Sequence, residues 1–129
     1  MKFTLILNLP QKGCSPNRSG TTRKHAKDIA SYRDESCIAA IAAMGIPKPG
    51  QRPVKLSATF YVHKTGLTKD RYRPRDVDNA LGSLKAAQDG IVDSGLIPND
   101  SWRWVRWGGA EIVVDGTGRP RVELEVEQL

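Results

Sequence analysis

The stretch Val54-Lys55-Leu56-Ser57-Ala58-Thr59-Phe60-Tyr61-Val62-His63 alternates apolar and polar side chains without interruption. Successive side chains of a β-strand point to opposite faces of the sheet, so this pattern predicts a strand with one buried face. It is the clearest strand signal in the chain. An apolar sheet face must be covered by another layer, which other parts of the chain must supply.

Two amphipathic helices are predicted, one on each side of this strand. The first runs from about Thr22 to Gly45, with Pro47 just beyond its end, and the second from about Asp78 to Asp93, with Gly95 to end it. Their apolar positions recur at helical spacing and are Ile29, Tyr32, Cys37, Ile41 and Met44 in the first helix, and Ala80, Leu81, Leu84, Ala87 and Ile91 in the second.

Shorter alternating stretches predict the remaining strands, at residues 3–8, 102–107, 111–114 and 122–126. The resulting order is β-α-β-α-β-β-β. This order indicates an α+β domain in which two helices pack on a small mixed or antiparallel sheet. A chain of 129 residues is enough for one such domain, so residues 1–129 are expected to form a single unit.

Charge is divided unevenly along the chain. Lys and Arg number 20 and Asp and Glu 14, giving a net charge of +6, which favours a polyanionic partner, nucleic acid ahead of an anionic membrane. Residues 1–75 hold 15 basic and 4 acidic residues, and residues 76–129 hold 5 and 10. No apolar run approaches the roughly 20 residues that span a bilayer, so we expect a cytoplasmic protein without membrane contact.

The sign of the charge changes at the motif Arg75-Asp76-Val77-Asp78-Asn79. In extended backbone, carboxylates at positions i and i+2 project to the same side, and such a pair needs a cation or a proton between them. Oxygen ligands suit Mg²⁺, or Mn²⁺ in its place. Asp100, on the turn after the second helix, is a candidate third carboxylate. The alternative is structural: Asp78 caps the helix and Asp76 favours its dipole.

The basic residues upstream of the motif, Arg71, Arg73 and Arg75, favour the chemical interpretation. Cations hold a nucleic-acid backbone, and a metal ion polarises the scissile phosphate and activates water. A basic strip beside clustered carboxylates is therefore what phosphodiester cleavage requires.

The ordered set Arg75-Asp76-x-Asp78-Asn79, Lys85-Ala86-Ala87-x-Asp89, Gly95 and Asn99-Asp100 resembles the RusA family of Holliday junction resolvases, which are bacterial and phage endodeoxyribonucleases. The specific match spans about residues 73–101, and the flanking elements agree in order and length only.

The resemblance implies a homodimer that binds four-way DNA junctions and nicks two strands symmetrically with Mg²⁺. It also implies that Asp76, Asp78 and Asp100 ligate the metal and that Lys85 is the essential lysine. The chain departs from the family pattern at Lys85, because the segment between Asn79 and Lys85 is three residues longer than in that pattern. In a continuous helix, a seven-residue step from Asp78 still returns Lys85 to nearly the same face. If the helix begins near Ser83 instead, the extra residues lie in the loop. The structural alternative for Lys85 is a solvated helix lysine.

Several further basic residues are candidate DNA contacts. Arg23, Lys24 and Lys27 crowd a helix N-terminus, where a bound phosphate would relieve their unfavourable interaction with the helix dipole. The full set of candidates is Arg18, Arg23, Lys24, Lys27, Lys69, Arg71, Arg73, Arg75, Arg103 and Arg106. Trp102, Trp104 and Trp107 either stack on unpaired bases or fill the core or a dimer contact.

Three functions are therefore compared: a junction-resolving endonuclease, a non-catalytic nucleic-acid-binding protein of the same fold, and a metal-dependent nuclease for other branched DNA or RNA. The resolvase accounts for both the carboxylates and the basic residues.

Overall fold

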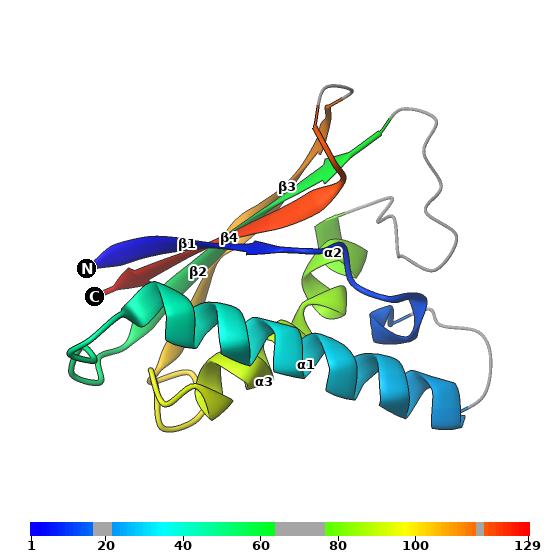
Figure 1. Ribbon diagram of the computed structural model, residues 1–129. Coiled ribbons are helices and arrows are strands. Elements are labelled where there is room, and N and C mark those ends of the chain that lie inside the picture. The colour runs from blue at the N-terminus through cyan, green and yellow to red at the C-terminus, as the bar shows by residue number, and fades with distance from the viewer. Residues whose placement is uncertain (17–21, 64–76, 116–117) are drawn as a thin grey trace.

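The computed structural model describes residues 1–16, 22–63, 77–115 and 118–129. The elements, in chain order, are β1 (Lys2–Leu7), the 3-10 helix η1 (Lys12–Cys14), α1 (Thr22–Met44), β2 (Val54–Val62), α2 (Val77–Ser83), α3 (Lys85–Asp93), β3 (Val105–Val114) and β4 (Arg121–Gln128). Figure 1 shows α1 and α3 side by side below a twisted sheet, with α2 toward one end.

The four strands form one mixed sheet in the order β1-β4-β2-β3. Strand β4 pairs antiparallel with both β1 and β2, whereas β2 and β3 are parallel. Parallel neighbours need a crossover connection, and the segment that holds α2 and α3 provides it. The crossover matters for function because both Asp78 and Asp100 lie on it.

The core lies between the sheet and the helices. Alternate residues of β2 are at most 4% exposed, as the sequence pattern predicts, and they are Val54, Leu56, Ala58, Phe60 and Val62. Val122, Leu124 and Val126 of β4 are fully buried, while the alternate glutamates of that strand are partly exposed. One face of the sheet therefore carries the core.

The predicted α+β fold, with helices on a mixed sheet, is confirmed. One detail differs: the strands predicted at 102–107 and 111–114 are a single strand, β3, which begins at Val105. The preceding turn is held by the backbone amides of Trp104 and Val105, which both donate to the carbonyl oxygen of Ser101, at 2.9 and 3.0 Å. Trp102 lies on this turn and is 78% exposed.

The buried face of α1 differs from the predicted one. Cys37 is only half-buried and Ile41 is 48% exposed. The buried positions follow steps of four residues through much of the helix and are His25, Tyr32, Ser36, Ala40 and Met44. Small residues lie there because α3 approaches closely: a Cβ added to Gly90 would lie 2.4 Å from the Arg33 carbonyl oxygen and 2.8 Å from the Ser36 Cβ.

The second predicted helix, 78–93, is broken into α2 and α3 at Leu84, whose φ and ψ are −96° and 7°. Gly82 is a weak helix former, and the Ser83 hydroxyl donates to the Ala80 carbonyl oxygen at 2.7 Å. Lys85 therefore begins a new helix. None of the described helices has the length and apolarity that spanning a membrane requires.

Candidate active site

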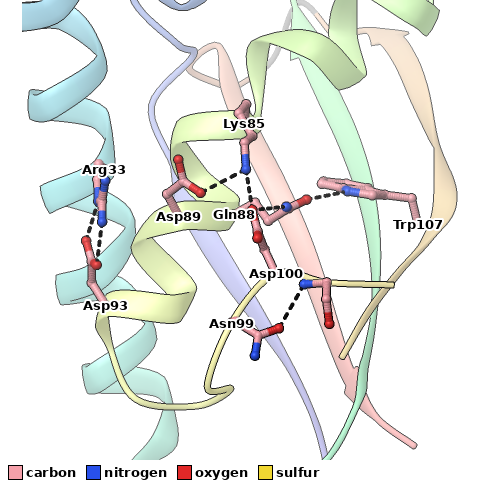
Figure 2. Close-up of polar contacts among 9 residues, drawn as sticks. Arg33, Lys85, Gln88, Asp89, Asp93, Asn99, Asp100 and Trp107 are labelled. Atoms are coloured by element: carbon pink, nitrogen blue, oxygen red, sulfur yellow. Dashed lines mark hydrogen bonds and ion pairs between the residues drawn. The ribbon is translucent and has the colours of Figure 1, made fainter. Parts of the chain in front are cut away.

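Lys85 is the first residue of α3 and the centre of a polar cluster shown in Figure 2. Its ammonium group forms a short ion pair with Asp100 and donates to Asp89, one turn further along α3, at 3.0 Å. A positive charge at a helix N-terminus opposes the helix dipole, and the two carboxylates offset that cost. The side chain is 60% exposed, so it is also open to an external anion.

Asp100 lies on the loop that connects α3 to β3. An Asx turn shapes this loop, because the backbone N–H of Ser101 donates to the Asn99 side-chain oxygen at 3.0 Å. The loop returns the chain to the first turn of α3, and this brings Asp100 into contact with Lys85. The Asp100 side chain is 37% exposed.

A second donor reaches the Asp100 carboxylate from α3. The Gln88 amide donates to Asp100 Oδ2 at 3.1 Å, and the amide oxygen of Gln88 accepts a hydrogen bond from the Trp107 indole at 2.8 Å. Figure 2 shows these side chains in one line, from β3 through α3 to the loop.

The electrostatics of the cluster favour its charged forms. The Lys85 hydrogen bond, followed by that from Gln88, holds the pKa of Asp100 below its ordinary value. Conversely, Asp100, with Asp89, raises the pKa of Lys85. At neutral pH the site therefore presents an ionised carboxylate and an ammonium group in contact.

The other two carboxylates of the predicted metal site are Asp78 and Asp76. Asp78 lies in the first turn of α2 and is exposed, and within the described residues no hydrogen bond or ion pair joins it to Lys85 or Asp100. Asp76 lies outside the described residues. No group of three or more metal-ligating side chains occurs in residues 1–16, 22–63, 77–115 and 118–129. Because Asp76 lies outside the described residues, the predicted three-carboxylate site stays a prediction.

The predicted carboxylate ligands nevertheless suit a hard divalent cation. Asp78 and Asp100 offer carboxylate oxygens, the ligands that Mg²⁺ and Mn²⁺ prefer. The two side-chain donors to Asp100, Lys85 and Gln88, both reach Oδ2. Asp100 already binds one cation, the Lys85 ammonium group.

A pocket of about 240 Å³ lies beside Lys85. It is formed where η1 and α1 meet the junction of α2 and α3, and Ile29, Gly82 and Ala86 are among its lining residues. Lys85 and Asp89 also line it, so an exposed hollow adjoins the polar cluster.

The candidate DNA contacts fall into separate groups. Arg23, Lys24 and Lys27 are exposed at the start of α1, and Arg103 and Arg106 are exposed around the start of β3. These two starts lie toward opposite ends of the molecule in Figure 1. The remaining candidates, Arg18, Lys69, Arg71, Arg73 and Arg75, lie outside the described residues.

The tryptophans also differ from one another. Trp104 and Trp107 pack against the core, whereas the exposed Trp102 lies under the Arg103 guanidinium at 5.4 Å. Core packing therefore describes two of them, and Trp102 is the one open to a base.

The sequence analysis gave no role in this cluster to Gln88, Asp89 or Trp107, although Asp89 stands in the family motif. Gln88 and Asp89 lie three and four residues after Lys85, a spacing that places them on the same helix face. That spacing was available in the sequence. Trp107, by contrast, arrives from β3, and no local pattern predicts its contact.

A carboxylate that can bind a metal ion and a lysine in contact with it on an exposed surface are compatible with an enzyme that cuts phosphodiesters. Consistent with this, the family described as Endodeoxyribonuclease RusA matches residues 11–127 of the 129. The chain belongs to the RusA family. It is accordingly an endodeoxyribonuclease of the Holliday junction resolvase class, a hydrolase of phosphodiester bonds. A search of curated proteins gave no match.

Membership favours the enzyme over a non-catalytic nucleic-acid-binding protein of the same fold, because the family is enzymatic. Nucleases of this family are generally dependent on a divalent metal ion.

Proposed function

We propose that this protein resolves four-way DNA junctions by paired, symmetric nicks, with Mg²⁺ as cofactor and as a homodimer. The observation that carries the proposal is the contact between Lys85 and Asp100 in a chain of the RusA family. Residues 1–129 act as one RusA-like endonuclease domain in this proposal, on DNA in the cytoplasm of a bacterium, whether the gene is bacterial or from a phage.

Asp76, Asp78 and Asp100 hold the metal ion. Their carboxylates match the preference of Mg²⁺ for oxygen, and Mn²⁺ can replace it. When bound, the ion supplies a Lewis acid that polarises the phosphate and activates water. The contribution of the chain is to keep these carboxylates ionised and oriented, and Asp100 is held in that state by its two donors.

Lys85 contacts the scissile phosphate. Its side chain is 60% exposed, and Asp100 and Asp89 raise its pKa, so the ammonium group is charged over the neutral range. A protonated lysine beside a phosphate stabilises the charge that develops in the transition state.

The exposed basic residues hold the DNA arms. Arg23, Lys24 and Lys27 at the start of α1 and Arg103 and Arg106 near β3 contact the backbone, together with the candidates outside the described residues. Their wide separation suits a branched substrate, which presents phosphates in several directions.

The homodimer follows from the substrate. A four-way junction has approximate two-fold symmetry, and one short chain carries one set of candidate carboxylates. A C2 dimer gives each strand its own site.

Junction cleavage tests the proposal directly. A labelled four-way junction is incubated with the protein and Mg²⁺, in parallel with linear duplex, a flap and structured RNA. We expect symmetric nicks in the junction only, and loss of cleavage with retained binding for Asp76→Asn and Asp78→Asn. Asp34→Asn, an exposed carboxylate on α1, is the matched control.

The alternatives give distinct outcomes. Faster cleavage of the flap or the RNA would assign the protein to another substrate, and cleavage that persists in EDTA would remove the metal from the proposal. Sedimentation of the protein with and without the junction measures the dimer.

A further inference from the structure

Gln88 occupies the position that the family motif leaves unspecified, Lys85-Ala86-Ala87-x-Asp89. Its side chain is half-buried between two partners that come from different elements. On one side the Trp107 indole of β3 lies 2.8 Å from Gln88 Oε1, and on the other Asp100 Oδ2 lies 3.1 Å from Gln88 Nε2. The amide is therefore held at both ends (Figure 2).

The direction of these hydrogen bonds is fixed by chemistry. An indole N–H can only donate, so the Gln88 amide must turn its oxygen toward Trp107. Its NH₂ group then points at Asp100, which accepts as a carboxylate. If the Gln88 amide were flipped, both hydrogen bonds would be lost. Its NH₂ group would then face the indole N–H, another donor, and its oxygen would face the Asp100 carboxylate, another acceptor. Trp107 thereby selects the one orientation of Gln88 that serves Asp100.

Trp107 is well placed to act as the fixed end of this chain. It packs against the hydrophobic core from the parallel pair of β2 and β3, in register with Leu56, which is fully buried. Asp100, in contrast, lies on a connecting loop and is partly exposed. Lys85 alone would hold Asp100 weakly, because its four-carbon side chain is flexible and exposed.

We propose that the Trp107–Gln88 pair is a positioning device for Asp100, which ties the carboxylate to the core and holds it in the orientation in which it would bind a metal ion. This inference rests on the proposed function, in which Asp100 is a metal ligand. Gln88 and Trp107 are positioning residues here and touch neither DNA nor metal.

The test compares Gln88→Met, which keeps the length of the side chain, with Trp107→Phe, which removes the indole N–H and keeps an apolar ring. Mn²⁺ binding is followed by electron paramagnetic resonance on the complex with a non-cleavable four-way junction. Cleavage of the normal junction is measured over a range of Mn²⁺ concentrations. We expect each variant to raise the Mn²⁺ Kd by about 10-fold, the lower end of the effect that outer hydrogen bonds to metal ligands have.

Two further results are expected from a positioning role. Saturating Mn²⁺ restores the cleavage rate to within about 2-fold of the wild type, since the outer hydrogen bond affects metal affinity more than chemistry. The double variant is no worse than Gln88→Met alone, because Trp107 acts through Gln88. An unchanged Kd in both single variants, a loss that Mn²⁺ does not restore, or additive effects in the double variant would each overturn the inference.

Matched controls separate folding from positioning. Gln51→Met alters a glutamine that is exposed and bonds to the Gly95 carbonyl oxygen, and Trp104→Phe alters a tryptophan packed on the same core. Both should keep the wild-type Kd, and thermal unfolding verifies that all variants fold.

Asp100→Asn distinguishes the failure of this inference from failure of the proposed function. If the wild type does not cleave the junction with Mn²⁺, the proposed function fails, and if Asp100→Asn leaves Mn²⁺ binding and cleavage intact, the metal-ligand role of Asp100 fails. If Asp100→Asn abolishes them while Gln88→Met and Trp107→Phe behave as the wild type, only the positioning role fails.

Discussion

Helix α3 has two dissimilar sides. Toward α1 it is held by shape, since Gly90 lies against the Arg33 carbonyl and Ser36 with no room for a methyl group. Toward the loop before β3 it is held by hydrogen bonds and charge, through Lys85 and Gln88. Close packing tolerates no added volume, whereas an exposed polar cluster contributes little to stability and can serve chemistry. Variants on the two sides should therefore fail in different assays.

The largest effect is expected on the polar side, from Lys85→Met. We expect the junction cleavage rate to fall by about 10²- to 10³-fold, the cost of removing one donor that stabilises transition-state charge. The free energy of unfolding should change by less than about 1 kcal/mol, because the lysine is an exposed partner in its ion pairs. Single-turnover cleavage and urea unfolding measure the two quantities.

Lys85→Arg is the informative companion, because it keeps the charge and changes the geometry. If Lys85→Met cleaved at the wild-type rate, the lysine would be the solvated helix residue of the structural alternative.

On the side packed against α1 we expect the reverse, a loss of stability with little change in cleavage. Gly90→Ala forces α1 and α3 apart, because the new Cβ would lie 2.4 Å from a backbone oxygen that cannot rotate away. We expect a loss of about 2 kcal/mol in the free energy of unfolding, within the range for overpacked cores. Cleavage by the folded protein should change by less than 3-fold.

Gly50→Ala is the matched control, since a Cβ there meets nothing within 4 Å. Equal stability of the two variants in urea would show that the helices can separate without cost, and the contrast between the two sides of α3 would be lost.

The smallest effect on stability is expected for the ion pair between Arg33 of α1 and Asp93 of α3, which lies on the packed side. Arg33 donates two hydrogen bonds to Asp93, at 2.5 and 2.7 Å, and this lowers the pKa of Asp93 from its ordinary value of 3.8. The pair therefore stabilises the fold above about pH 4, and the stabilisation disappears as the pH falls through the lowered pKa. Both side chains are partly exposed, so the contribution of the pair at pH 7 should be small.

Urea unfolding of Arg33→Gln against the wild type, from pH 7 to pH 3, measures this contribution. The difference between the two proteins should shrink as the pH falls. A difference that stays constant with pH would mean that Arg33 stabilises the fold by packing its aliphatic part instead.

The sequence predicted those parts of the fold that depend on local periodicity. The strand at 54–63, helix α1 and the order of the elements follow from alternation and helical spacing. The predicted buried face of α1 was wrong at Ile41, which is exposed. The buried face is set by the close approach of α3 at Gly90, which is distant in sequence and leaves room only for small α1 residues. The break at Leu84 depends likewise on a side-chain hydrogen bond and a glycine within an otherwise amphipathic stretch.

The site was predictable in a similar measure. Asp100 was expected beside Asp76 and Asp78, whereas the contact that the structure gives it is with Lys85. Gln88 and Trp107 escaped prediction because their roles exist only when the helix, the loop and β3 are assembled. The relation of Asp76 and Asp78 to Asp100 stays a prediction, since Asp76 lies outside the described residues.

The order of strands has a consequence for how the chain folds. Strand β4 is the last element in sequence, yet it lies between β1 and β2 and supplies partners to both. Until residues 121–128 are present, β1 has no neighbour in the sheet. The pairing of β1 with β4 closes a loop that spans most of the chain, and such long-range contacts slow folding. During synthesis the complete sheet therefore cannot form before β4 is made. Until then the apolar faces of β1 and β2 are open to association with other chains.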